Sequence, residues 1–281
     1  MRIYITGHKG QLGRELEKAL ADHTCFGGDL PDVDITDLAS VRSSVAATRP
    51  DIVIHAAAMT DVDGCARNPD LAYRVNALGT RNVALACQAA GCPMLAISTN
   101  EVFDGRADRP YLEFDAAGPI NPYAQSKLAG EVFVRDLLTR FYIVRTAWLF
   151  GYGGVNFVSK IRQRALSDGK LRVVTNEIGS PTFAVDLSGA IARLIGTGAY
   201  GIYHFVNDGV CSRYELAQEV LRQTGLSHIP IQPITLADIS RPSTPPLYTP
   251  LRNFCGAAIG ITFRPWQDAL AEYLANEDFG M

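Results

Sequence analysis

The sequence has 281 residues, with 26 basic and 29 acidic side chains and a net charge of −3. This balance offers no broad basic surface for nucleic acid or an anionic membrane, and no apolar run approaches the roughly 20 residues that cross a bilayer. The six cysteines form no Cys-x-x-Cys pair and the five histidines complete no zinc spacing. We therefore expect no metal site, free thiols and a location in the reducing cytoplasm.

Short apolar runs alternate with longer helical patterns in the first half of the chain. This alternation predicts an α/β fold built on a Rossmann-type doubly wound parallel sheet, with helices on both faces. The run 52–58 does not alternate between apolar and polar residues, as expected of a strand buried on both faces. The expected strands are 3–6, 25–28, 52–56, 94–98 and 142–146, and the expected helices are 11–21, 38–48, 70–90 and 122–138.

The pattern loosens after about residue 150. Helical patterns at 156–167, 185–195, 213–223 and 266–275 are separated by joints rich in glycine and proline. We expect residues 1–150 to form a dinucleotide-binding Rossmann domain. Residues 151–281 would form mainly a smaller mixed α/β substrate-binding domain, with some segments returning to the Rossmann sheet. The stretch 230–250 has six prolines and is expected to be an irregular binding loop or lid.

A glycine-rich motif, Gly7-His-Lys-Gly10-Gln-Leu-Gly13, follows the first predicted strand and opens the first predicted helix. In this context Gly7 allows a tight turn, Gly10 lets the backbone approach a pyrophosphate, and Gly13 permits close packing of helix on sheet. The helix N-terminus would add N–H donors for the phosphates. A glycine-rich turn without a ligand is the alternative, which the strand–turn–helix context disfavours. The residues predicted to bind a cofactor here are Gly7, Gly10, Gln11, Leu12 and Gly13.

Asp29 lies at the end of the second predicted strand. A carboxylate there can accept hydrogen bonds from the adenine ribose hydroxyls and would repel a 2′-phosphate, which mildly favours NADH over NADPH. Asp32 and Asp34 lie close by, and any of the three could instead be a loop carboxylate. Asp34 and Ile35 are also well placed to contact the adenine.

Tyr123 and Lys127 lie four residues apart in a predicted helix, and this spacing puts both side chains on one face. Reduction of a ketone needs a hydride on carbon and a proton on oxygen. A tyrosine can supply that proton if its pKa of about 10 is lowered, and a nearby ammonium favours the phenolate. Lys127 could do this and also bind the nicotinamide ribose. The Tyr-x-x-x-Lys spacing is common by chance, but it gains weight behind the glycine motif and a Ser98-Thr99 strand end.

Together these motifs resemble the short-chain dehydrogenase/reductase superfamily, in its extended branch acting on nucleotide sugars. Within that branch the chain is most similar to the dTDP-4-dehydrorhamnose reductases, over nearly its whole length. The matching segments are Gly10-Gln-Leu-Gly13, 56–63, Asn76, Ser98-Thr99 with 102–105, Pro122-Tyr-x-x-x-Lys127, 145–148, 179–182 with Asp186, 201–205 and Arg241-Pro242.

This resemblance implies roles for individual residues. Tyr123 would protonate the C4 oxygen of the sugar, Thr99 would hydrogen-bond the same oxygen, and Lys127 would tune the tyrosine and hold the ribose. The cofactor would be NADPH or NADH, the substrate a dTDP-linked 4-keto sugar, and the assembly a homodimer. Ala56, Ala57 and Ala58 would contact the cofactor, and Thr60, Val102, Trp148 and Arg241 would bind the substrate, although Trp148 could equally be a core aromatic residue.

Four positions depart from the family pattern, one of them Ala66, where an acid is common. Asn100 stands where an aspartate is usual, Glu101 where a tyrosine is usual, and Pro245 where an arginine is expected near the nucleotide diphosphate. Sugar-nucleotide dehydratases carry Thr-Asp-Glu at 99–101, and an amide at Asn100 cannot deliver the proton that elimination requires. We expect Asn100 to be a hydrogen-bonding group. Glu101 would either face the sugar or be solvated.

Two other interpretations stay open from the sequence. The chain could be an epimerase or dehydratase acting on a nucleotide sugar, with a tightly retained cofactor and no net oxidation. It could also be a non-catalytic regulatory subunit, since this fold occurs in a regulatory subunit of methionine adenosyltransferase. The presence of Thr99, Tyr123 and Lys127 together disfavours a purely regulatory role.

Overall fold

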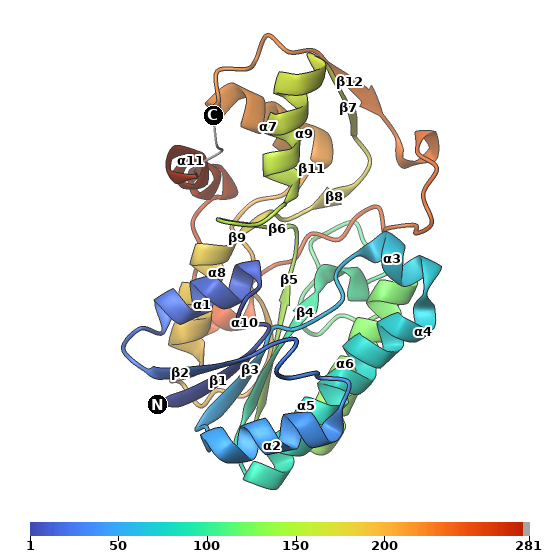
Figure 1. Ribbon diagram of the computed structural model, residues 1–281. Helices are drawn as coiled ribbons and strands as arrows, with labels where there is room; N and C mark the ends of the chain where they lie inside the picture. Colours follow the sequence, from blue (N-terminus) through green and yellow to red (C-terminus); the bar gives the residue numbers. More distant parts are fainter. Residues whose placement is uncertain (278–281) are drawn as a thin grey trace.

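The computed structural model describes residues 1–277 and is built around one parallel sheet (Figure 1). Six strands pair in the order β10-β5-β4-β3-β1-β2, all of them parallel to their neighbours. The predicted α/β fold is confirmed. The strands are β1 (Arg2–Thr6), β2 (Thr24–Gly28), β3 (Ile52–His55), β4 (Met94–Thr99), β5 (Phe141–Thr146) and β10 (Gly201–His204).

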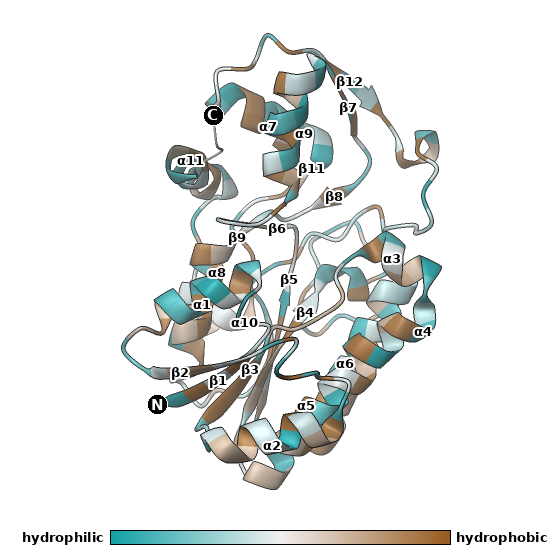
Figure 2. Ribbon diagram, in the orientation of Figure 1, coloured by the Kyte–Doolittle hydropathy of each residue, from teal (hydrophilic) through white to brown (hydrophobic). Residues whose placement is uncertain are grey.

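Helices cover both faces of this sheet (Figure 1). One face packs on α1 (Gln11–Ala19) and α8 (Ala184–Leu194), and the short α10 (Cys255–Ala258) contacts β10. The other packs on α2 (Leu38–Thr48), α5 (Thr80–Ala90) and α6 (Pro122–Leu137). Figure 2 shows hydrophobic residues along the central strands, as expected of strands buried from both sides.

The expected helix over 70–90 is interrupted. It consists of α4 (Pro69–Ala72), a π-helical turn η1 (Tyr73–Gly79) and then α5. The wider turn carries Asn76, whose Oδ1 accepts from Met59 N at 2.8 Å and whose Nδ2 donates to Ser126 Oγ at 3.1 Å. Periodicity does not reveal such a turn. Its effect is to join the loop after β3 to the helix that carries Tyr123.

The remaining elements pack around a second hydrophobic cluster, which contains Phe150, Phe183 and Trp266. Its helices are α7 (Phe157–Asp168), α9 (Arg213–Gln223) and α11 (Trp266–Asn276). The stretch 230–250 is not wholly irregular, because β12 (Ile231–Ile234) pairs in parallel with β7 (Leu171–Val174) and η3 (Leu236–Asp238) follows. The short elements are α3 (Val62–Arg67), η2 (Asn100–Val102), β6 (Leu149–Phe150), β8 (Ile178–Gly179), β9 (Thr182–Phe183) and β11 (Cys211–Ser212).

A buried ion pair joins helix α6 to two strands of the sheet. Glu131 of α6 pairs with Arg145 of β5 at 2.7 Å, and both side chains are under 5% exposed. Ser98 at the end of β4 donates a hydrogen bond to Glu131, and Arg145 Nε donates to the same carboxylate at 2.9 Å. Because each charge is fully partnered, the pair fixes the position of α6 against the strand ends.

Residues 1–277 contain neither a membrane-spanning helix nor a cluster of metal-ligating side chains. No helix among residues 1–277 is long and apolar enough to cross a membrane. Within the same residues, no group of three or more His, Cys, Asp and Glu side chains is arranged to hold a metal ion. The six cysteines are free thiols.

The substitution Glu131→Gln tests the buried pair. It leaves the Arg145 charge buried without a counter-ion, so we expect the free energy of unfolding to fall by about 3 kcal/mol. The measurement is urea unfolding of the variant and the parent. The matched control is Glu219→Gln, which breaks the surface pair with Arg222 and should leave the urea midpoint almost unchanged. Equal effects of the two substitutions would contradict the assigned role of Glu131.

Candidate active site

The glycine motif forms a tight loop between β1 and α1. Gly7 has φ +75°, and a Cβ at this position would lie 2.6 Å from Ala57 N. A Cβ at Gly13 would overlap the backbone of Gly7 and His8. Both positions therefore require glycine. The close packing at Gly13 is against the loop itself, whereas the sequence predicted packing of helix on sheet.

A cavity of about 290 Å³ opens beside this loop. Asp29 lies at its rim, where its carboxylate accepts from Lys9 N at 3.2 Å and Leu30 N at 3.0 Å. A glycine-walled cavity with a carboxylate at the end of β2 fits the adenosine half of a dinucleotide. The predicted cofactor residues that line it are Gly7, Gly10, Asp29, Asp34, Ile35, Ala56, Ala57 and Ala58.

Five predicted cofactor residues lie outside the lining of this cavity: Tyr123 and Lys127 of α6, and three residues of the glycine motif. The Gln11 side chain donates to Gly151 O, which ties the loop to the chain after β6. Leu12 is 7% exposed and packs in the core beneath α1. Gln11 and Leu12 would therefore bind a phosphate only through their backbone N–H groups at the start of α1. Gly13 would contribute only because it has no side chain to obstruct the loop.

Tyr123 is positioned by the start of α6. Asn121 caps this helix by accepting from Ala124 N at 2.9 Å, and Pro122 takes the first helical position. Thr99, at the end of β4, is near enough to the Tyr123 hydroxyl to influence its pKa. Burial raises the pKa of Tyr123 well above its ordinary value, and the Glu101 carboxylate adds to the rise. The expected lowering by Lys127 is therefore wrong here, and the phenol keeps its proton at neutral pH.

Lys127 lies one turn further along the same helix. Its Nζ donates to Ile97 O at 2.7 Å, which anchors the ammonium to β4. Burial lowers the pKa of Lys127 to about 8, and the Glu131 carboxylate opposes that shift. The charged and neutral forms of Lys127 are therefore equally populated at about pH 8.

The segment Thr99-Asn100-Glu101 forms a hydrogen-bonded turn. Thr99 Oγ1 accepts from Glu101 N at 3.2 Å, and Asn100 Nδ2 donates to Thr249 Oγ1 at 2.6 Å. Asn100 thus connects β4 to the late loop, in agreement with the expected hydrogen-bonding role. Glu101 Oε2 accepts from Asn121 Nδ2 at 2.7 Å, and burial raises the pKa of this carboxyl. Glu101 is therefore not a solvated surface group.

The residues predicted to bind substrate differ in their environments. Thr60 is exposed at the end of the loop after β3. Val102 is fully buried with Phe103, so the prediction that it lines the sugar is wrong, because its side chain belongs to the core. Trp148 has φ +44° and is half-buried. Arg241 Nε lies 3.0 Å from Asp63 Oδ1, in a pair that joins the late loop to α3.

Two groups near the site escaped sequence reasoning. His55 at the end of β3 bonds Thr6 Oγ1 at 2.7 Å and Thr80 Oγ1 at 3.0 Å, and burial lowers its pKa to about 3. Glu131, which pairs with Arg145, lies four residues after Lys127 on one face of α6. That spacing was visible in the sequence. The partners of His55 depend on strand order, which no local pattern gives.

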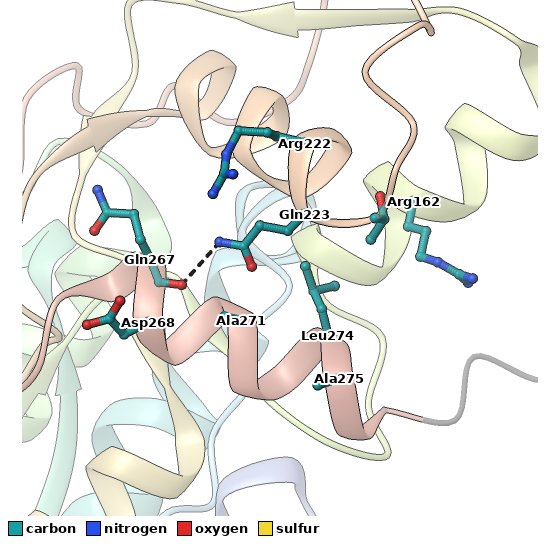
Figure 3. Close-up of a pocket in the computed structure, with 9 residues that line it drawn as sticks. Arg162, Arg222, Gln223, Gln267, Asp268, Ala271, Leu274 and Ala275 are labelled. Carbon is teal, nitrogen blue, oxygen red and sulfur yellow. Dashed lines mark hydrogen bonds between the residues drawn. The ribbon is translucent and has the colours of Figure 1, made fainter.

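Another hollow lies between α9 and α11 (Figure 3). Gln223 Nε2 crosses it to donate to Gln267 O at 3.2 Å. None of the predicted site residues lines it. The candidate active site is therefore the region around Thr99, Tyr123 and the glycine loop.

Comparison with known proteins gives consistent matches over the whole chain. A family model described as the RmlD substrate binding domain matches residues 1–279. The dTDP-4-dehydrorhamnose reductase of Streptomyces griseus is 40% identical, over 96% of this chain and 92% of that protein. The crystal structure of a dTDP-4-dehydrorhamnose reductase from Clostridium acetobutylicum is 39% identical, covers 98% of this chain and 99% of that one, and gives a TM-score of 0.94. One from Bacillus anthracis, in complex with NADP, is 37% identical with 98% coverage of both chains and a TM-score of 0.94.

The lowered pKa of Lys127 predicts a pH dependence of cofactor binding. The side chain is charged below about pH 8 and neutral above it, so the affinity for NADPH should fall as the pH rises through about 8. The fall should reach up to about tenfold per pH unit if the full charge contributes to binding. The measurement is fluorescence titration of NADPH from pH 6.5 to 9.5. The Lys127→Arg variant stays charged and should show no such fall; an identical fall in that variant would exclude Lys127 as its source.

Proposed function

The chain belongs to the family of the RmlD substrate binding domain, and we propose that it reduces the C4 ketone of a dTDP-linked 4-keto-6-deoxy sugar with NADPH or NADH. This is the reaction of a dTDP-4-dehydrorhamnose reductase, in the synthesis of dTDP-L-rhamnose. The observation that carries the proposal is the position of Tyr123 at the start of α6, which packs on β4, close to Thr99 at the carboxyl end of β4 in the same sheet as the cofactor loop. Relatives named as dTDP-4-dehydrorhamnose reductases support the substrate.

Tyr123, Thr99 and Lys127 have different roles in the proposed reduction. A bound reduced nicotinamide supplies the hydride. Tyr123 and Thr99 present their hydroxyls to the C4 oxygen, and Tyr123 gives its proton to that oxygen as negative charge develops on it. The pKa of Tyr123 is raised by burial, so the phenol carries its proton before the reaction begins. Lys127, whose Nζ donates to Ile97 O, would hold the nicotinamide ribose.

The alternative activities fit the site less well. Elimination needs an acid at position 100, but the Asn100 amide donates to Thr249 and its Oδ1 accepts from Thr99 Oγ1 at 3.3 Å. An epimerase on this scaffold would recycle its cofactor without net oxidation, and turnover with measured loss of NADPH distinguishes the two. A regulatory subunit has no use for the neighbouring hydroxyls of Thr99 and Tyr123.

Domain division, assembly and location follow as part of the same proposal. Residues 1–150 would bind the dinucleotide and 151–281 mainly the substrate, with β10 in the six-stranded sheet as a segment of the second part.

The free state of all six cysteines supports a reducing cytoplasm. A homodimer is supported by the family resemblance and by three exposed apolar side chains on α4 and η1, namely Leu71, Tyr73 and Leu78.

Tyr123→Phe tests the proton donor. The substitution removes the hydroxyl and keeps the ring, so turnover of the keto sugar should fall about 10²–10⁴-fold while NADPH binding stays nearly intact. The measurement is sugar-dependent loss of NADPH absorbance, with NADPH binding titrated in parallel. Turnover that survives in the variant would show that another group donates the proton.

Asp29→Asn tests the choice between cofactors. Removing the negative charge at the rim of the adenosine cavity should relieve repulsion of a 2′-phosphate and raise the ratio of NADPH to NADH efficiency about tenfold. Both backbone hydrogen bonds of Asp29 involve its side-chain oxygens, so asparagine can keep one of them. The measurement is kcat/KM with each cofactor. An unchanged ratio would mean that Asp29 does not face the ribose.

A further inference from the structure

Arg213, the first residue of α9, has an environment that the sequence did not indicate. Its guanidinium carbon lies 3.7 Å from the ring centroid of Trp148 and 4.9 Å from that of Phe157. Nε and Nη2 each lie 2.9 Å from Glu177 Oε1. A planar cation held by an aromatic face and a carboxylate has few orientations left, so it is preorganised for a ligand.

Backbone and side-chain hydrogen bonds connect Arg213 to the Thr99–Glu101 segment through the late loop. The Glu101 carboxyl acts electrostatically on Tyr123, and its own charge is stabilised by the guanidinium groups of Arg213 and Arg241. Arg213 N donates to Glu177 O at 3.1 Å, and Thr249 N of the late loop donates to Ile178 O at 2.9 Å. Thr249 Oγ1 in turn accepts from Asn100 at 2.6 Å, next to Glu101. A nucleotide sugar whose ketone meets Tyr123 would extend along this side of the late loop toward Arg213 and Arg241.

The Arg213 side chain has capacity for a further partner. It is 21% exposed, and both of its contacts with Glu177 go to a single carboxylate oxygen. A guanidinium carries more N–H donors than these contacts use. Arg241 is similarly placed, at 29% exposure with its Nε on Asp63. The carboxylates fix both cations in place while leaving donor edges free.

We propose that Arg213 binds the diphosphate of the nucleotide sugar together with Arg241, and so supplies the cation that Pro245 does not. This inference rests on the proposed function, because it assumes a nucleoside diphosphate in the site. It makes Arg213 a binding and specificity-determining residue rather than a packing partner of Trp148. The diphosphate would receive charge-assisted hydrogen bonds from two guanidinium groups on different elements, α9 and the late loop.

The test compares two ligands that differ by the diphosphate alone. Thymidine and dTDP are titrated calorimetrically into the full chain and into Arg213→Gln. We expect dTDP to bind at least about tenfold more weakly to the variant, with thymidine changed less than about twofold. The matched control is Arg222→Gln, which lies on the same helix and also removes an arginine paired with a glutamate. It should change neither affinity.

Each other outcome is decisive. Unchanged dTDP affinity in Arg213→Gln would overturn the inference, as would an equal loss for thymidine, which would mark Arg213 as a support for Trp148. A parent protein that fails to bind dTDP would overturn the proposed substrate as well, so the two failures are distinguishable. If Arg213→Gln does not fold, Arg213→Lys decides: weaker dTDP binding with unchanged thymidine binding supports the inference, and parental dTDP affinity contradicts it.

Discussion

The buried pair of Glu131 and Arg145 is the interaction on which the geometry of the site depends. It joins α6 to β5, and through Ser98 to the last residues of β4. Taking two charges out of water is costly, and the cost is offset only when every partner is in place. The register of α6 against the strand ends is therefore fixed, and with it the distance between Thr99 on the sheet and Tyr123 on the helix.

A chain of hydrogen bonds connects the end of β4 to the start of α6. Thr99 accepts from Glu101 N, the Glu101 carboxylate accepts from Asn121, and Asn121 caps the helix that carries Tyr123. Each member positions the next. The result is a phenol that is buried, protonated and oriented before substrate arrives, which is the preorganisation that proton donation to a developing alkoxide requires.

Sequence patterns predicted those features of the fold and site that depend on residues close together in the chain. The strand runs, the cap at Asn121, the glycine loop and the helical spacing of Tyr123 and Lys127 are all set by neighbours in the sequence. Other features depend on which distant segments meet. The pairing of β12 with β7, the burial of Val102, the partners of Glu101 and the raised pKa of Tyr123 arise from tertiary packing. The segment around Asn76 was predictable as a helix, but its wider π-helical turn was not.

The central claim is that hydride arrives at C4 of the sugar. It is tested most directly by turnover of dTDP-4-keto-6-deoxy sugar with NADPH carrying deuterium at the reactive C4 position of the nicotinamide, followed by NMR analysis of the sugar product. The account predicts one deuterium at C4 of the sugar for each NADPH oxidised. Sugar product without the label, or with deuterium at another carbon, would contradict it.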